Sequence, residues 1–161
     1  ILVPQIDGIF CTAGLAQKTY PNGTAVYVYT YRNEFFVLDS GLSVTTRMNT
    51  IDTTTTAKIK VATLRKGSSS NLSSPPTIVN RKVSALKNLV FIQSQMFSDN
   101  ETIGEKEYTP VDIYDLNDRT YMGSFRLPLY KKERLSEFMV LDQHRILLIY
   151  PSGILSLWVR F

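Results

Sequence analysis

A strand–turn–strand pattern recurs three times along this chain, and it constrains the fold more than any other feature of the sequence. Each copy consists of an apolar strand, a short polar turn and a second apolar strand. Each copy also has an upstream strand pair, clearest before the second and third copies, at Val83–Ile92 and Glu137–Leu148. The three copies centre on Phe36–Leu42, Ile113–Tyr121 and Ile149–Leu155.

Four short antiparallel strands per repeat are the composition of a β-propeller blade. The strand segments, such as Ala25–Tyr31, are β-branched and aromatic, and no segment has the 3.6-residue period of an amphipathic helix. The sequence therefore predicts an all-β fold, a single domain over 1–161 made of about three antiparallel propeller blades. The predicted blades are approximately 14–52, 77–128 and 134–161, and the insertions 53–76 and 98–108 are predicted loops or hairpin extensions.

A β-sandwich or barrel is the alternative fold, because short strands separated by turn signals are common to both classes. The pairing of the strands distinguishes them. Blades pair only strands that follow one another in sequence, whereas a sandwich brings together Greek-key partners.

Most catalytic and metal chemistry is disfavoured by the scarcity of imidazole and thiol groups. The chain has one histidine, His144, and one cysteine, Cys11, whereas nucleophilic triads and zinc sites need these groups as bases or clustered ligands. His144 follows Asp142-Gln143 in a predicted hairpin turn, where it is either an exposed turn residue or a ligand or general base. We predict no catalytic residue, no metal site and no cofactor.

Asp115, Tyr29 and Tyr31 join His144 as candidate binding residues. Asp115 flanks a turn, where a carboxylate either accepts from backbone donors or, with Asp112 or Asp118, binds calcium or acts in acid–base chemistry. Tyr29 and Tyr31 belong to an alternating tyrosine stripe that either stacks on sugars or bases or packs between sheets.

Net charge and hydropathy restrict the classes of partner that the chain can have. The excess of 18 Lys and Arg over 14 Asp and Glu gives a net charge of +4, with the basic residues scattered, which does not favour nucleic acid. No apolar run reaches the roughly 20 residues that a membrane-spanning helix needs. We therefore predict neither a nucleic-acid partner nor a transmembrane segment.

Three stretches resemble a known family: 74–80 before a blade, 113–128 within one, and the closing 149–153. They are similar to the C-terminal portion of six-bladed β-propeller proteins of the secreted kind found in Bacteroidetes, and distantly to NHL and TolB propellers. The resemblance is best over the second half of the chain. It implies an extracytoplasmic protein, in the periplasm or at the cell surface, whose loops meet ligands at one face of a central channel.

About three blades are countable, whereas the family closes its ring with six. An open propeller leaves strand edges unpaired and prone to association. We therefore expect the missing blades to come from chain upstream of Ile1 or from a second copy.

Two functional hypotheses follow. The first is a non-enzymatic binding or protein-interaction module of a secreted or surface-anchored propeller protein, in which the insertions 53–76 and 98–108 meet a glycan, a peptide or a protein. The alternative is a propeller enzyme of the lyase or lactonase type, whose active site is completed by residues outside this chain. Both depend on analogy between folds.

Overall fold

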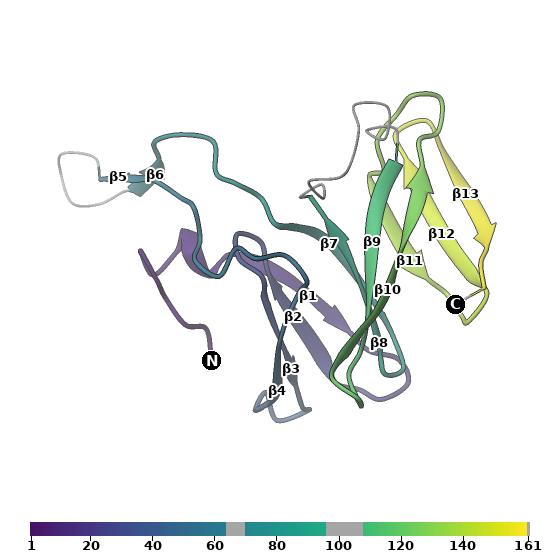
Figure 1. Cartoon of the computed structure of the whole chain (residues 1–161), viewed down its shortest axis with the longest axis horizontal. Coiled ribbons are helices and arrows are strands. Elements are labelled where there is room, and N and C mark those ends of the chain that lie inside the picture. The colour runs from purple at the N-terminus through teal and green to yellow at the C-terminus, as the bar shows by residue number, and fades with distance from the viewer. Residues whose placement is uncertain (64–69, 96–107, 161) are drawn as a thin grey trace.

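The computed structural model describes residues 1–63, 70–95 and 108–160, and its arrangement is shown in Figure 1. Apart from one short 3-10 turn, η1 (Phe10–Thr12), every regular element of the described residues is a β-strand. The chain is therefore all-β, as its sequence predicts. Within the described residues, no helix has the length and apolarity required to cross a membrane.

The first blade is a four-stranded antiparallel meander in which each strand pairs with the next along the chain. Its two central strands are rich in aromatic and β-branched residues, which favour a pleated, half-buried surface. The strand order is β1-β2-β3-β4. The strands are β1 (Gly14–Lys18), β2 (Ala25–Tyr29), β3 (Glu34–Leu38) and β4 (Val44–Asn49).

The second blade repeats this meander after the first insertion. Its order along the sheet, β10-β9-β8-β7, again pairs only consecutive strands. The strands are β7 (Asn80–Leu86), β8 (Leu89–Ser94), β9 (Tyr108–Asp115) and β10 (Thr120–Pro128).

The third blade has three strands in the order β11-β12-β13. Its strands are β11 (Glu137–Val140), β12 (Arg145–Tyr150) and β13 (Gly153–Trp158). No Greek-key pairing occurs among the described strands, so the sheets are propeller-type blades and the sandwich or barrel alternative is excluded.

The three blades stand side by side, with their first strands together (Figure 1). β7 packs against both β1 and β11. The first strands therefore form the inner wall of the arrangement, and the fourth strands β4 and β10 lie at the opposite edges of their sheets.

Two apolar clusters fill the spaces between neighbouring blades. One joins blade 1 to blade 2 and includes the fully buried Val26, Phe35 and Ile92. The other joins blade 2 to blade 3 and includes the fully buried Phe91 and Leu148. The core of the protein thus lies between sheets, which is how blades that each have two apolar faces bury them.

Buried polar groups also cross from blade to blade. The side-chain amide of Asn80, at the start of β7, donates to the carbonyl oxygens of Tyr29 at 2.8 Å and Arg32 at 2.9 Å. The phenol oxygen of Tyr114 accepts from the backbone N–H of Ile51 at 3.0 Å. Such bonds fix the register of one blade against the next.

The first insertion forms a small hairpin that projects from the blades, with strands β5 (Val61–Thr63) and β6 (Ser70–Leu72). The hairpin begins near a small cluster of Cys11, Ala57 and Ile59, against which Tyr31 packs. Of the second predicted insertion, 98–107 lies outside the described residues, and Tyr108 is already the first residue of β9.

Candidate functional site

A cleft opens where the first turn of each blade meets the first turns of its neighbours. These are the β1–β2, β7–β8 and β11–β12 turns, which converge because β1, β7 and β11 are adjacent. The N–H of Lys87 in the second turn donates to the carbonyl of Tyr20 in the first at 2.8 Å. The cleft has a volume of about 560 Å³ and is lined by Tyr20, Pro21, Leu86, Lys87, Leu141, Asp142, Gln143, His144, Arg145 and Trp158.

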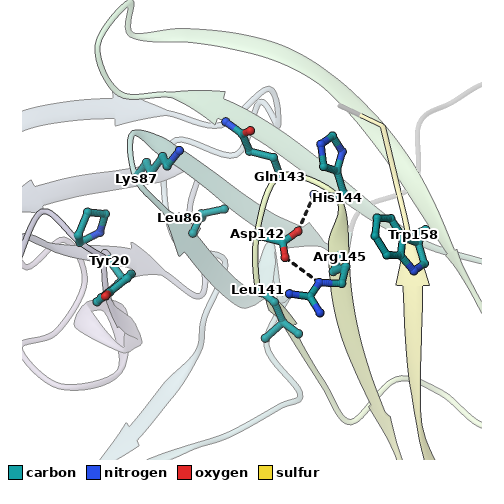
Figure 2. A pocket seen from close by; sticks show the side chains of 10 residues that line it. Tyr20, Leu86, Lys87, Leu141, Asp142, Gln143, His144, Arg145 and Trp158 are labelled. Atoms are coloured by element: carbon teal, nitrogen blue, oxygen red, sulfur yellow. Dashed lines mark hydrogen bonds and ion pairs between the residues drawn. The ribbon is translucent and has the colours of Figure 1, made fainter.

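Aromatic and aliphatic side chains are unusually exposed at this cleft. Tyr20 is 75% exposed and Trp158 is 78% exposed, while Leu141 on the third turn is 40% exposed. Figure 2 shows Tyr20 and Trp158 at opposite sides of the row of turn residues. Isolated exposed apolar residues are ordinary, but several gathered around one hollow are typical of a binding surface.

The third turn is held together by Asp142, whose carboxylate accepts hydrogen bonds from two later residues of the turn, His144 and Arg145 (Figure 2). It accepts from the backbone N–H of His144 at 2.9 Å and from Nε of Arg145 at 2.7 Å. The backbone bond from His144, followed by the Arg145 bond, lowers the pKa of Asp142. The imidazole of His144 stacks on the Trp158 indole, with ring planes 16° apart and centroids 6.4 Å apart.

The second turn is anchored by a hydrogen bond between its Asn88 side chain and the Asp115 carboxylate, at the end of β9. Asp115 accepts from the side-chain amide of Asn88 at 2.8 Å and from the backbone N–H of Asn117 at 2.7 Å. Burial pushes the pKa of Asp115 upward, but these bonds together outweigh it and the pKa is lowered. Lys87, next to Asn88, has a φ of 55°, in the left-handed region, and its side chain lines the cleft.

The four candidate binding residues do not form one site. His144 lines the cleft, whereas Asp115 is not part of the lining and contacts the second turn through Asn88. Tyr29 is fully buried: its ring lies under the guanidinium of Arg32, 3.5 Å from its centroid, and its oxygen accepts from the N–H of Val3. Tyr31 packs on the insertion's small cluster, away from the cleft.

Of the residues that line the cleft, only His144 was a candidate binding residue from the sequence; Tyr20, Lys87 and Trp158 are among those that were not. The signal that could have found Tyr20 and Lys87 is the repeat itself. Equivalent turns of consecutive blades must lie together, and turn residues were visible after Tyr20, at Lys87 and at Asp142. Trp158 reaches the cleft through its pairing with Arg145 across β12 and β13.

Other ionisable groups lie away from the cleft. Asp112 is buried in β9, where it accepts from the Ser124 hydroxyl; burial is the main cause that raises its pKa, and the nearby Asp52 raises it further. In the part of the chain that the structure describes, no three histidine, cysteine or acidic side chains are grouped so as to hold a metal ion.

Comparison with known proteins does not identify a family for this chain. No protein-family model and no curated protein matches the sequence. Among solved structures, the WD40 domain of Neurospora crassa Pan2 is similar over 91% of this chain, with 13% identity and a TM-score of 0.24. The chain spans 52% of that domain's length. At this TM-score the similarity adds no weight to the fold assignment, which rests on the strand pairing.

Proposed function

We propose that the chain is a non-enzymatic protein-interaction module that binds a peptide segment of a partner in the cleft between the three first turns. The observation that carries the proposal is the pair of exposed aromatic residues, Tyr20 and Trp158, on the same hollow as the Lys87 ammonium. Tyrosine, tryptophan and arginine are the residues that most often supply binding energy at protein interfaces.

The chemistry of the lining favours a peptide with apolar side chains and an acidic group. Leu86, Leu141 and Pro21 offer apolar contact, and Lys87 supplies a positive charge at the middle turn. The carboxylate of Asp142 is already bound by Arg145, so its charge is largely compensated within the turn. An acidic residue of the ligand would therefore meet a net positive surface.

The test is to select binders from a random heptapeptide phage library on the wild-type chain and to measure the enriched peptides on variants. Trp158→Ala and Tyr20→Ala should each weaken binding by about tenfold or more, as for truncation of an interface aromatic. Lys87→Gln should weaken most the peptides that contain Asp or Glu. The matched control is Met122→Ala, an exposed apolar truncation on β10 outside the cleft lining.

The proposal fails if enriched peptides bind the Tyr20→Ala, Trp158→Ala double variant as tightly as the wild type. It also fails if Met122→Ala weakens binding as much as Trp158→Ala. Far-ultraviolet circular dichroism of each variant checks that the β-structure is retained.

We also propose a wider setting for the module: a six-bladed ring in an extracytoplasmic protein, as the resemblance to secreted Bacteroidetes propellers implies. In such a ring the first turns would gather at one mouth of the central channel. The finding that supports this proposal is the adjacency of β1, β7 and β11, since first strands line the channel of a propeller. Localisation of the tagged protein by cell fractionation tests the extracytoplasmic part.

A further inference from the structure

A second, smaller pocket lies at the end of blade 2 that is opposite the cleft. It forms where β7 begins, β8 ends and β9 begins, together with the segment that leads into β11. In Figure 1 these strand ends lie at the top of blade 2, whereas the β7–β8 turn lies at the bottom. The pocket has a volume of about 250 Å³, and its lining includes Arg81, Gln93, Leu129, Arg134 and Leu135.

A buried carboxamide that lacks a hydrogen-bond donor distinguishes this pocket. Gln93 is 8% exposed, and among the described residues its side-chain oxygen has no hydrogen-bond partner. The residue lies on the same face of β8 as Phe91, the face toward blade 3. A buried acceptor without a donor is unfavourable and rare in folded proteins. An N–H or O–H group of a ligand in the pocket would supply the donor that the chain does not.

Two arginines give the same pocket a positive charge. Arg81 occupies a β-bulge, since the register of β7 against β8 shifts between Asn80 and Lys82, and bulges are common beside functional sites. Its Nε donates to the side-chain oxygen of Gln95, which orients the guanidinium and leaves its two terminal nitrogens for a ligand. Arg134 is exposed on the segment before β11. Among the described residues, no acidic side chain lines the pocket or pairs with either arginine.

The rest of the lining and the size of the pocket restrict the ligand further. Leu129 and Leu135 offer apolar contact, and Leu135 belongs to the cluster that joins blades 2 and 3. A volume of about 250 Å³ is below the roughly 300–1,000 Å³ of sites that enclose drug-sized molecules. The ligand group is therefore small, with an anion, a hydrogen-bond donor and an apolar part close together.

We propose that this pocket binds the C-terminal residue of a peptide. Its α-carboxylate is held by Arg81 and Arg134, its amide N–H donates to the oxygen of Gln93, and its apolar side chain contacts Leu129 and Leu135. The guanidinium fork matches the geometry of a carboxylate. A phosphate monoester also carries negative charge, but it is largely a dianion at pH 7 and has no proton for Gln93. The site is separate from the cleft between the first turns.

The acetylated hexapeptide Gly-Ser-Gly-Ser-Gly-Leu with a free carboxyl end is a suitable probe. Titration into the full chain, followed by two-dimensional NMR of the backbone amides, gives both the affinity and the place of binding. We expect shifts at residues 93–95 and 134–135. The same peptide with a C-terminal amide should bind about tenfold more weakly or worse, because its charge is lost. Acetyl-leucine has the same end group, and binding of it equal to that of the hexapeptide would identify the ligand as a free acylamino acid.

Variants of the lining assign the contacts. Arg81→Gln should weaken binding of the free-acid peptide by about tenfold or more, and Gln93→Leu by about threefold, as expected for a charged and a neutral hydrogen bond. Gln93→Leu should fold as the wild type does, since it removes a buried oxygen that has no donor. Arg119→Gln makes the same charge change at an exposed residue of the β9–β10 turn, outside the lining, and is the matched control.

Four results would overturn the proposal. They are the absence of binding at millimolar concentration, equal binding of the acid and the amide, an Arg119→Gln variant that loses as much affinity as Arg81→Gln, and tighter binding of inorganic phosphate than of the peptide. The Tyr20→Ala, Trp158→Ala double variant of the cleft should bind the hexapeptide as the wild type does. The proposals for the cleft and for this pocket therefore fail separately.

Discussion

The hydroxyl oxygen of Ser84 accepts a hydrogen bond at 2.9 Å from the backbone N–H of Val140, so a side chain of blade 2 satisfies the backbone of blade 3. Both residues are buried, with Ser84 3% exposed and Val140 4% exposed. β11 is a short strand, from Glu137 to Val140, and this bond ties it to β7. The contact between the inner strands β7 and β11 thus includes a directional hydrogen bond as well as apolar packing.

Ser84→Ala should destabilise the fold by about 1–3 kcal/mol, the effect of leaving a buried donor without a partner. Urea unfolding followed by circular dichroism measures the change. The control, Ser152→Ala, makes the same chemical change at a serine in an exposed turn and should change stability by less than about 0.5 kcal/mol. Equal effects of the two variants would contradict the role of the Ser84–Val140 bond.

Asn80→Ala should destabilise the protein by about 2 kcal/mol or more, because two buried carbonyl oxygens, those of Tyr29 and Arg32, lose their donor together. Thermal unfolding gives the measurement. Asn71→Ala on the projecting hairpin is the control, since Asn71 is exposed. If Asn80→Ala unfolds at the wild-type temperature, the amide does not hold blade 2 against blade 1.

Asp112→Asn should stabilise the protein at pH 7 and have little effect below pH 4. The pKa of Asp112 is raised, chiefly by burial, above the ordinary carboxyl value of 3.8. Its ionised form is therefore disfavoured in the folded state, and the wild type loses stability as pH rises from that ordinary value through the raised one. Asparagine keeps an oxygen that accepts from Ser124 without the charge.

The measurement for Asp112→Asn is the difference in unfolding temperature between variant and wild type across pH 3 to 7, so that other titrating groups cancel. We expect this difference to be positive at pH 7 and to shrink on acidification. Asp118→Asn, in an exposed turn, is the control. A difference that grows on acidification would reverse the predicted sign.

Lys87→Gly should leave stability nearly unchanged while it removes the positive charge from the cleft. At the left-handed φ of 55°, a residue with a side chain is disfavoured by about 1 kcal/mol, and glycine removes this penalty. The greater conformational freedom of glycine in the unfolded chain costs a similar amount, so the two effects offset each other. Lys87→Val, with a β-branched side chain at the same φ, should destabilise the protein by more than about 1 kcal/mol. Thermal unfolding distinguishes the variants. Equal stabilities would show that the turn relaxes.

The sequence determined the elements of this fold because strand signals are local. Aromatic and β-branched runs such as 25–29 and 145–150 favour strands, and the Asn, Asp and Gly residues between them favour turns. The repeated order of these signals was sufficient to predict antiparallel meanders. The role of Asp115 as a turn residue was also readable, because a carboxylate at that position accepts from the next backbone donors.

The tertiary structure alone decided which residues meet. Tyr29 and Trp158 are both aromatic strand residues, yet one is fully buried and the other is 78% exposed. Strand alternation gives each residue a face, but burial depends on what covers that face. The N-terminal segment reaches the Tyr29 phenol through Val3, whereas the outward face of blade 3 lies open at Trp158. The cleft likewise exists only because three turns, distant in sequence, converge where the inner strands pack.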